Sequence, residues 1–210
     1  MIVTTQQLID RIRRAYYNDY PSDASVLTDN ELLLHINDAV AVVAAKQTNE
    51  AFALTGIRMV PEGYITTYKL TSFTKDADTG YYYASLPHAP FGFPENSGVN
   101  SVFFSGIKGQ SKPVLYVSAN EVDYFKDMAI PPGAAFYWIE GNQLYMWVKT
   151  NLPAGAQVSV RMATHVTSNL DAPINVPPDA INMVFDLVWQ RIAVRKGIVQ
   201  DNITDGVERS

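Results

Sequence analysis

The apolar residues change their spacing twice along this chain, and this change limits the fold more than any other feature of the sequence. Near both ends they recur every three or four residues, as on one face of an α-helix. Between the ends, short runs of aromatic and β-branched residues alternate with Gly, Pro, Asn and Asp, as strands and turns do. We therefore expect an α+β protein with a β-rich segment inserted between helices.

Capping residues mark the starts of two N-terminal helices. Thr4 and Gln7 have the spacing of a capping box, in which each side chain binds the backbone amide of the other residue. Thr28 and Glu31 repeat that spacing ahead of a longer apolar pattern. The second helix has a wide apolar arc, which is typical of a helix packed between two neighbours. The two helices are predicted over residues 5–17 and 29–50.

A third long helix is expected from about Pro178 to Gly197. Its apolar residues have helical spacing, and a proline at the start with a glycine at the end suits helix termini. Because the apolar faces of the terminal helices need partners, we expect one discontinuous helical bundle from residues 1–60 and 171–200. Residues 61–170 would then form an inserted β-domain, and residues 201–210 a flexible polar tail.

The middle of the chain predicts an antiparallel β-sandwich or small barrel. Gly141-Asn142 is a two-residue turn between two aromatic runs, which predicts a tight hairpin. Ser118 and Glu121 have capping-box spacing and predict a short helix over residues 119–127. About seven strands are expected, at residues 64–73, 81–86, 99–105, 114–118, 135–140, 143–149 and 157–164.

The composition argues against several classes of function. Among 210 residues there is no cysteine, which excludes disulfides and thiolate chemistry. The net charge of −5 argues against a DNA-coating protein, since such a protein needs a basic surface. Only 18% of the residues are charged, as expected for a chain that hides part of its surface against partners. We expect no signal peptide, and no apolar stretch approaches the ~20 residues of a membrane span.

No local motif for catalysis, metal binding or cofactor binding is apparent. The phosphate-binding, dinucleotide-binding and nucleophile-elbow patterns are absent, and the histidines His35, His88 and His165 lie far apart in sequence. Residues 75–80 resemble the first half of a calcium loop, but Leu86 stands where that loop needs Glu. A hairpin turn explains the same residues. We therefore expect no enzyme, no metal and no cofactor.

Aromatic residues are the richest feature of the middle segment, since the chain has 12 Tyr, 9 Phe and 3 Trp. Three consecutive tyrosines, 81 to 83, cannot all face one core, because strand side chains alternate between faces. Exposed aromatics serve protein interfaces and sugar stacking, and the same residues also suit an ordinary core with its edges. The candidate interface residues in this segment are Tyr81, Tyr82, Tyr83, Trp138 and Trp147.

Three arginines on the first helix lie mostly off its apolar stripe. A solvated helix face explains Arg11, Arg13 and Arg14, and a surface for an acidic partner is the alternative. Arg11 and Arg14 therefore join the candidate interface residues.

Three stretches, spread over residues 5–195, occur in an order that resembles one protein family. They are the two N-terminal helices with Leu27–Ala39, the Tyr81–Pro87 strand end with Gly98-Val99 and the Gly141-Asn142 hairpin, and the proline-led helix start at Val176-Pro177-Pro178. Together they are similar to the head–tail connector and tail-tube adaptor ring proteins of tailed bacteriophages, particularly short-tailed and crAss-like phages.

The resemblance implies a structural protein of the virion with a helical bundle, a β-domain and no enzymatic activity. Copies would form a ring of twelve below the portal, extend the DNA channel and anchor tail components. The partners would be the portal, other connector or tail proteins, and packaged DNA that passes without sequence-specific binding. The protein would be made in the host cytoplasm and would need no membrane. An acidic balance suits a channel lining, because it repels DNA phosphates.

Two other functions compete with this one. A carbohydrate-binding β-sandwich module would need exposed, coplanar aromatic rings beside polar groups on one face of the sheet. A hydrolase centred on His88 or His165 would need a nucleophile and a carboxylate within hydrogen-bond reach of the imidazole.

Overall fold

The computed structural model describes residues 3–17, 27–93, 98–105, 112–128, 134–149, 151–152, 155–165 and 169–195. The contacts within the chain divide it into two compact units. Unit 1 comprises residues 1–43 and 166–210, and unit 2 comprises residues 44–165. Each unit is described by itself below. The expected tail over residues 201–210, and the expected helix end at Gly197, lie outside the described residues.

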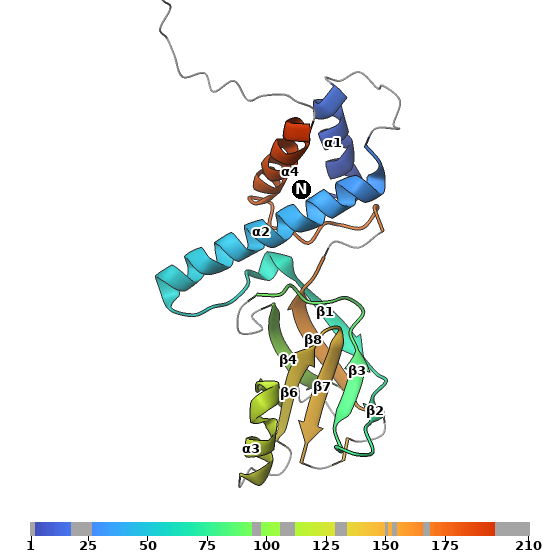
Figure 1. Ribbon diagram of the computed structural model, residues 1–210, viewed down its shortest axis with the longest axis vertical. Helices are drawn as coiled ribbons and strands as arrows, with labels where there is room; N and C mark the ends of the chain where they lie inside the picture. The colour runs from blue at the N-terminus through green and yellow to red at the C-terminus, as the bar shows by residue number, and fades with distance from the viewer. Residues whose placement is uncertain are drawn as a thin grey trace, which may run out of the picture. The chain divides into compact units, whose positions relative to one another are not determined.

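Unit 1 is built from helices. They are α1 (Thr5–Tyr17), the first part of α2 (Asp29–Thr55) and α4 (Ile181–Arg195). Helices α1 and α4 contact each other, and Figure 1 shows them side by side. The large buried side chains come from the predicted apolar stripes, and they are Leu8, Ile9, Ile12, Leu32, Ile36, Val184, Val188 and Ile192.

The capping residues act as the sequence predicts. The backbone N–H of Thr4 donates to Gln7 Oε1 at 3.1 Å, and the N–H of Gln7 donates to Thr4 Oγ1 at 3.2 Å. The predicted capping box at the start of α1 is therefore confirmed. The backbone N–H of Glu31 donates to Thr28 Oγ1 at 3.2 Å. Helix α2 continues to Thr55, past the predicted end near residue 50, because nothing there breaks the helix before the glycine that follows.

An extended segment ties the start of α1 to the chain that leads into α4. The backbone N–H of Gln6 donates to the carbonyl of Leu170 at 2.8 Å, and that of Ile174 donates to the carbonyl of Val3 at 3.0 Å. The N–H of Thr5 also donates to Ala172 O at 3.3 Å. These bonds satisfy amides that a helix start leaves without intrahelical partners.

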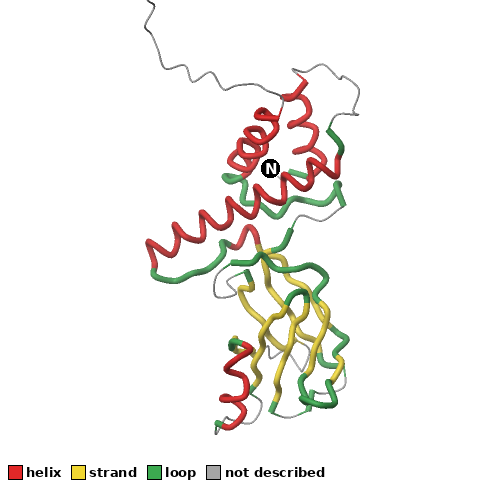
Figure 2. The backbone as a smooth tube through the Cα atoms, viewed as in Figure 1, coloured by secondary structure: helices red, strands yellow, loops and turns green. Residues whose placement is uncertain are grey.

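Unit 2 contains one curled sheet of eight strands with a mixed arrangement. Its order is β1-β8-β4-β5-β6-β7-β3-β2, and all neighbours are antiparallel except β5 and β6, which are parallel. Figure 2 shows the strands curling around a common interior. The strands are β1 (Ile65–Leu70), β2 (Thr74–Lys75), β3 (Tyr82–Ser85), β4 (Val99–Ser105), β5 (Lys112–Tyr116), β6 (Ala135–Glu140), β7 (Gln143–Val148) and β8 (Gln157–Ala163).

The predicted α+β class with a strand-rich region is confirmed, whereas the predicted antiparallel sandwich or small barrel is corrected to one mixed sheet that curls into a half-barrel. The parallel pair arises because η3 (Ala119–Glu121) and α3 (Val122–Asp127) lie in the connection between β5 and β6. A connection containing a helix lets the chain return in the same direction, whereas a hairpin cannot. The short strand β2 also escaped prediction, because two residues show no alternation.

The concave face of the sheet holds the main core of unit 2. It is mostly aliphatic and draws side chains from seven of the eight strands. The buried members are Leu70, Ala84, Leu86, Val99, Val102, Val114, Ala135, Tyr137, Leu144, Met146, Val158, Val160 and Met162. Because the sheet curls, these residues bury one another without a second sheet.

Candidate interaction surfaces

The convex face of the sheet carries an aromatic cluster on β6 and β7. Strand alternation sends Phe136 and Trp138 to this face while their neighbours enter the core. Phe136 stacks on Trp147 with ring centroids 5.7 Å apart, and Trp138 stacks on Tyr145 at 5.4 Å. Both pairs lie directly opposite each other in the β6–β7 register, so the hairpin turn sets the stacking.

Helix α3 covers part of this cluster, and Figure 1 shows it beside β6. The ring of Phe125 lies 5.3 Å from that of Phe136. Tyr81 packs edge-on against Trp138 at 4.9 Å, and its hydroxyl donates to Asp123 Oδ1 at 3.0 Å. Hydrogen bonds from Lys126 and Tyr81 lower the pKa of the Asp123 carboxyl below its usual range. These contacts fasten α3 to the start of β3.

The three consecutive tyrosines divide between the two faces, as strand alternation requires. Tyr82 packs against the inner core, and its hydroxyl accepts a hydrogen bond from the backbone N–H of Leu152 at 3.1 Å. Tyr81 joins the aromatic cluster. Tyr83 is half-buried, and its ring lies 6.0 Å from that of Tyr145, its partner in the β3–β7 register.

The candidate interface residues on the sheet differ in accessibility. Trp138 is only 4% exposed, because Tyr81 and Tyr145 cover its ring, so it cannot serve as a sugar-stacking platform. Trp147 and Tyr83 are half-buried and keep part of each ring at the surface. The rings of Tyr83 and Tyr145 are tilted by 37° to each other, whereas the sugar-binding alternative needs coplanar rings.

The exposed large apolar side chains of unit 2 come from two regions of the chain. The first, the α2-end group, follows the end of α2 and comprises Phe52, Leu54, Ile57 and Met59. Arg58 places its guanidinium 4.8 Å from the ring centroid of Phe52 in this group. The second, the β5–α3 group, comprises Leu115, Tyr116, Tyr124 and Met128. The periodicity of the sequence did not predict either exposed group, because apolar residues on an amphipathic helix or strand are expected in the core.

The arginines of α1 have different surroundings. Arg13 forms an ion pair with Asp29 at 2.7 Å and donates to the carbonyl of Leu27. Arg11 donates to Asn182 Oδ1 at 3.1 Å and lies over the ring of Phe185 at 4.3 Å, so it is directed toward α4. Arg14 is exposed and makes no ion pair within the described part of the chain.

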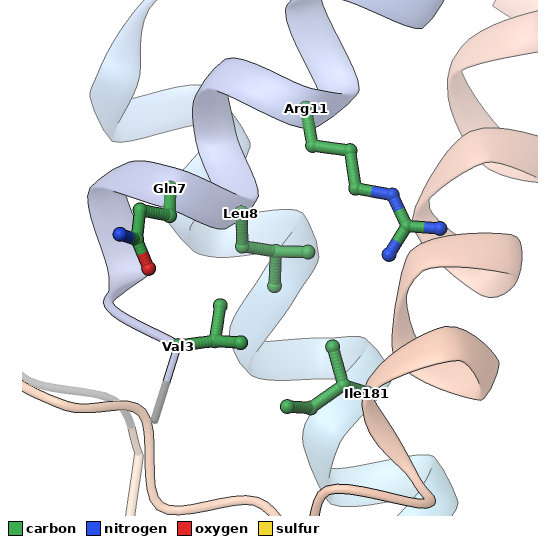
Figure 3. A pocket seen from close by; sticks show the side chains of 5 residues that line it. All are labelled: Val3, Gln7, Leu8, Arg11 and Ile181. Carbon is green, nitrogen blue, oxygen red and sulfur yellow. The ribbon is translucent and has the colours of Figure 1, made fainter. Parts of the chain in front are cut away.

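A pocket of about 320 Å³ opens between α1 and α4 in unit 1. Val3, Leu8 and Ile181 supply its apolar walls, while Gln7 and Arg11 supply polar groups. Figure 3 shows the three apolar side chains directed toward one another, with the Arg11 guanidinium extended toward α4. The pocket thus pairs apolar walls with one cation, and it could not be predicted from sequence because Val3 and Ile181 are far apart in the chain.

The histidines and the calcium-like loop have structural contacts. His88 packs edge-on near Tyr68, and His165 packs edge-on against Phe91. Asp76 accepts the backbone N–H groups of Asp78 and Thr79, which lowers the pKa of its carboxyl and shapes the turn between β2 and β3. The residues that the structure describes contain no cluster of three potential metal ligands.

The chain matches no protein-family model, and a search of curated proteins finds no significant relative. Within the described residues, no helix combines the length and the apolar character needed to cross a membrane.

Proposed function

We propose that this protein is a structural component of a phage head-to-tail connector, in which copies of the chain form a ring below the portal. The observation that carries the proposal is the pair of exposed apolar groups in unit 2. A closed ring needs heterologous contacts, in which one patch of each copy meets a different patch of the next copy. The α2-end group and the β5–α3 group are two such patches.

The charge pattern supports the same assignment. The α2-end group holds Arg58, whereas the segment of the β5–α3 group around α3 holds the exposed Glu121, beside the ion pair that Asp123 forms with Lys126. The Glu121 carboxylate would meet the cation across an apolar contact, which favours one orientation of the neighbouring copy. A net charge of −5 also suits a channel through which DNA slides, because phosphates are repelled.

In the proposed connector, a discontinuous helical bundle docks on the portal ring above. Helices α1 and α4 pack together although more than 160 residues separate Arg11 from its partner Asn182. Arg191 on α4 also pairs with Asp38 on α2 at 3.1 Å. In this arrangement the helices form the docking part, and the sheet presents the platform for tail components.

The test combines location with assembly. Cryo-electron microscopy of the purified particle should show a closed ring of this chain between head and tail. In solution, the protein mixed with its portal should form a complex whose mass corresponds to a ring, as measured by native mass spectrometry. Absence of the chain from purified particles contradicts the proposal.

A matched pair of variants tests the surface itself. Leu54→Glu places a charge at the most exposed member of the α2-end group and should abolish ring formation on the portal. Asn49→Glu adds the same charge at an exposed polar position on the same helix and should leave assembly unchanged. Both residues are exposed, so neither change should unfold the protein, and thermal melting checks this.

A further inference from the structure

The curled sheet of unit 2 has two edges, because its strand order is linear. In the part of the chain that the structure describes, β1 and β2 stand at the ends, and each pairs with only one neighbouring strand. β2 contributes two residues, whereas β1 contributes six. The outer edge of a terminal strand carries backbone N–H and C=O groups to which a further strand can bind. β1 is therefore the edge that offers the longer template.

The hydrogen bonds of β8 show how the backbone of β1 is oriented. The backbone N–H of Ala163 donates to Gly98 O at 2.8 Å, so the backbone groups of Ala163 face the β4 side. Backbone groups alternate between the two sides of an antiparallel strand, which directs those of Val160 toward β1. Val160 is the register partner of Tyr68. The backbone groups of Tyr68 therefore bond to β8.

A proline gives an independent check of this alternation. Pro113 of β5 is the register partner of Phe103 on β4. Because proline has no N–H, this pair suits a position at which β4 bonds to β8 instead of to β5. Phe103 is paired with Ser159 of β8, and counting on from Ser159 again directs the backbone groups of Tyr68 toward β8.

The residues on either side, Thr67 and Lys69, therefore turn their backbone groups to the open edge. Both side chains are exposed. Among the described residues, neither has a hydrogen-bond or ion-pair partner at this edge. The N–H of Ile65 already donates to Glu62 O, so the open stretch begins after it. Thr67 and Lys69 thus offer one donor and one acceptor each, with the spacing of an antiparallel ladder.

The two faces of β1 determine which side chains suit an added strand. Tyr68 and Leu70 pack in the inner core, so Thr67 and Lys69 lie on the opposite face. Residues directly opposite each other on neighbouring strands place their side chains on the same face. An added strand would therefore set one side chain beside Tyr68 and the preceding one beside Lys69. The ring favours an apolar neighbour, and the ammonium group favours a carboxylate.

We propose that the open edge of β1 binds an extended, antiparallel segment of a partner protein, with a carboxylate opposite Lys69 and an apolar residue opposite Tyr68. The sheet edges of a second copy do not supply this pattern. β1 has no carboxylate, and Glu62 just before it pairs with Arg161. β2 carries Lys75, which would meet Lys69 as a like charge. The edge lysine thus opposes self-pairing and leaves the edge to an acidic partner.

An NMR titration tests the proposal with a defined probe. The probe is the peptide acetyl-Val-Glu-Val-Thr-Val-Thr-amide, whose Glu lies opposite Lys69 when its first Thr lies opposite Thr67. Adding it to the nitrogen-15-labelled full chain should shift the amide signals of Thr67 and Lys69 and slow their exchange with water. The amide of Tyr68 already bonds to β8 and should change less.

Two methylated peptides of identical composition separate backbone pairing from side-chain contact. N-methylation of the residue opposite Thr67 removes an N–H that would donate to Thr67 O, and it should weaken binding about tenfold. N-methylation of the valine opposite Tyr68 alters an N–H on the outer side of the added strand, and it should change the affinity by less than about twofold. Equal affinities for the two methylated peptides overturn the proposal, and so does an absence of binding at millimolar concentrations of the unmethylated peptide.

Charge reversal tests the choice of an acidic partner. Lys69→Glu should weaken binding of the peptide about threefold, and replacing the Glu of the peptide by Lys should restore it. Lys112→Glu makes the same change at an exposed position of β5 and should leave the affinity unchanged.

Two further outcomes would overturn the proposal. One is undiminished binding of the peptide to Lys69→Glu. The other is a shift of the Thr67 and Lys69 amides with protein concentration alone, because the occupant would then be a second copy. None of these outcomes depends on ring assembly, so the proposed function can hold or fail separately.

Discussion

The two faces of the sheet in unit 2 are built from the same strands, yet they differ in chemistry and closure. The inner face is mainly aliphatic, and Leu144, Met146 and Val158 have no exposed surface at all. The outer face is aromatic, and α3 covers only part of it. Curling therefore buries one face completely, whereas the rings on the other face are covered in part by helix α3. The stability of unit 2 should therefore depend mostly on the inner face. Contacts with partners should use surfaces outside that face.

The largest expected effect is the loss of a side chain from the inner face. Leu144→Ala should destabilise the protein by about 3 kcal/mol, because it leaves a cavity in a closed core. Urea unfolding followed by circular dichroism measures the change. Leu54→Ala removes the same atoms from a side chain that is 87% exposed, and it should cost less than about 0.5 kcal/mol. Similar losses for the two variants would contradict the assignment of the core.

Alkaline pH should destabilise the inner face through one phenol. Burial raises the pKa of Tyr137 to about 12, and Tyr116 nearby adds to the rise. An unfolded tyrosine ionises near pH 10, so this contribution to stability is intact below pH 10 and is lost as the pH rises toward 12. Wild type should lose about 1.4 kcal/mol per pH unit more than Tyr137→Phe in this window. Unfolding by urea at several pH values tests this, and parallel curves for the two proteins would contradict it.

Much of the local structure could be predicted from the sequence. The Thr4–Gln7 capping box and the bounds of α1 were predicted because capping depends on residues three apart. The β6–β7 hairpin was predicted because Gly141-Asn142 suits a two-residue turn, and in the structure Gly141 has the positive φ, 58°, that such a turn requires. In these cases the chemistry that decides the structure lies within a few residues of sequence.

The parts that depend on distant contacts could not be predicted. Alternation placed Trp138 on one face of its strand, but only the fold shows that Tyr81 and Tyr145 cover it. The parallel pairing of β5 with β6 depends on where α3 packs, which no local pattern encodes. The pocket joins Val3 to Ile181 across most of the chain. The helices and strands could therefore be predicted better than the way in which their side chains come together.

A smaller effect is expected when the cover of the outer face is removed. Phe125→Ala should destabilise the protein by about 2 kcal/mol, less than the inner-face variant, because Phe125 is already partly exposed. It should also uncover Phe136, on which Trp147 stacks, so the tryptophan emission maximum should shift to longer wavelength. Tyr124→Ala removes the neighbouring ring, which is 68% exposed, and serves as the control with little change in either measurement. An unchanged emission spectrum for Phe125→Ala would contradict the covering role of α3.

The smallest expected effect comes from the hydrogen bond that fastens α3 to β3. Tyr81→Phe removes the hydroxyl that donates to Asp123 and keeps the ring against Trp138, so it should lower the free energy of unfolding only slightly, since water can replace an exposed hydrogen bond. The pKa of Asp123 should rise toward its ordinary value of 3.8, which an NMR titration of the carboxyl can follow. A lowered pKa stabilises the folded state above that value, and the benefit is lost as the pH falls through the folded pKa. Tyr83→Phe is the matched control, because this hydroxyl makes no hydrogen bond within the described part of the chain. If both variants behave alike, α3 is held by ring packing alone, and the outer face depends on the same nonpolar contacts as the inner face.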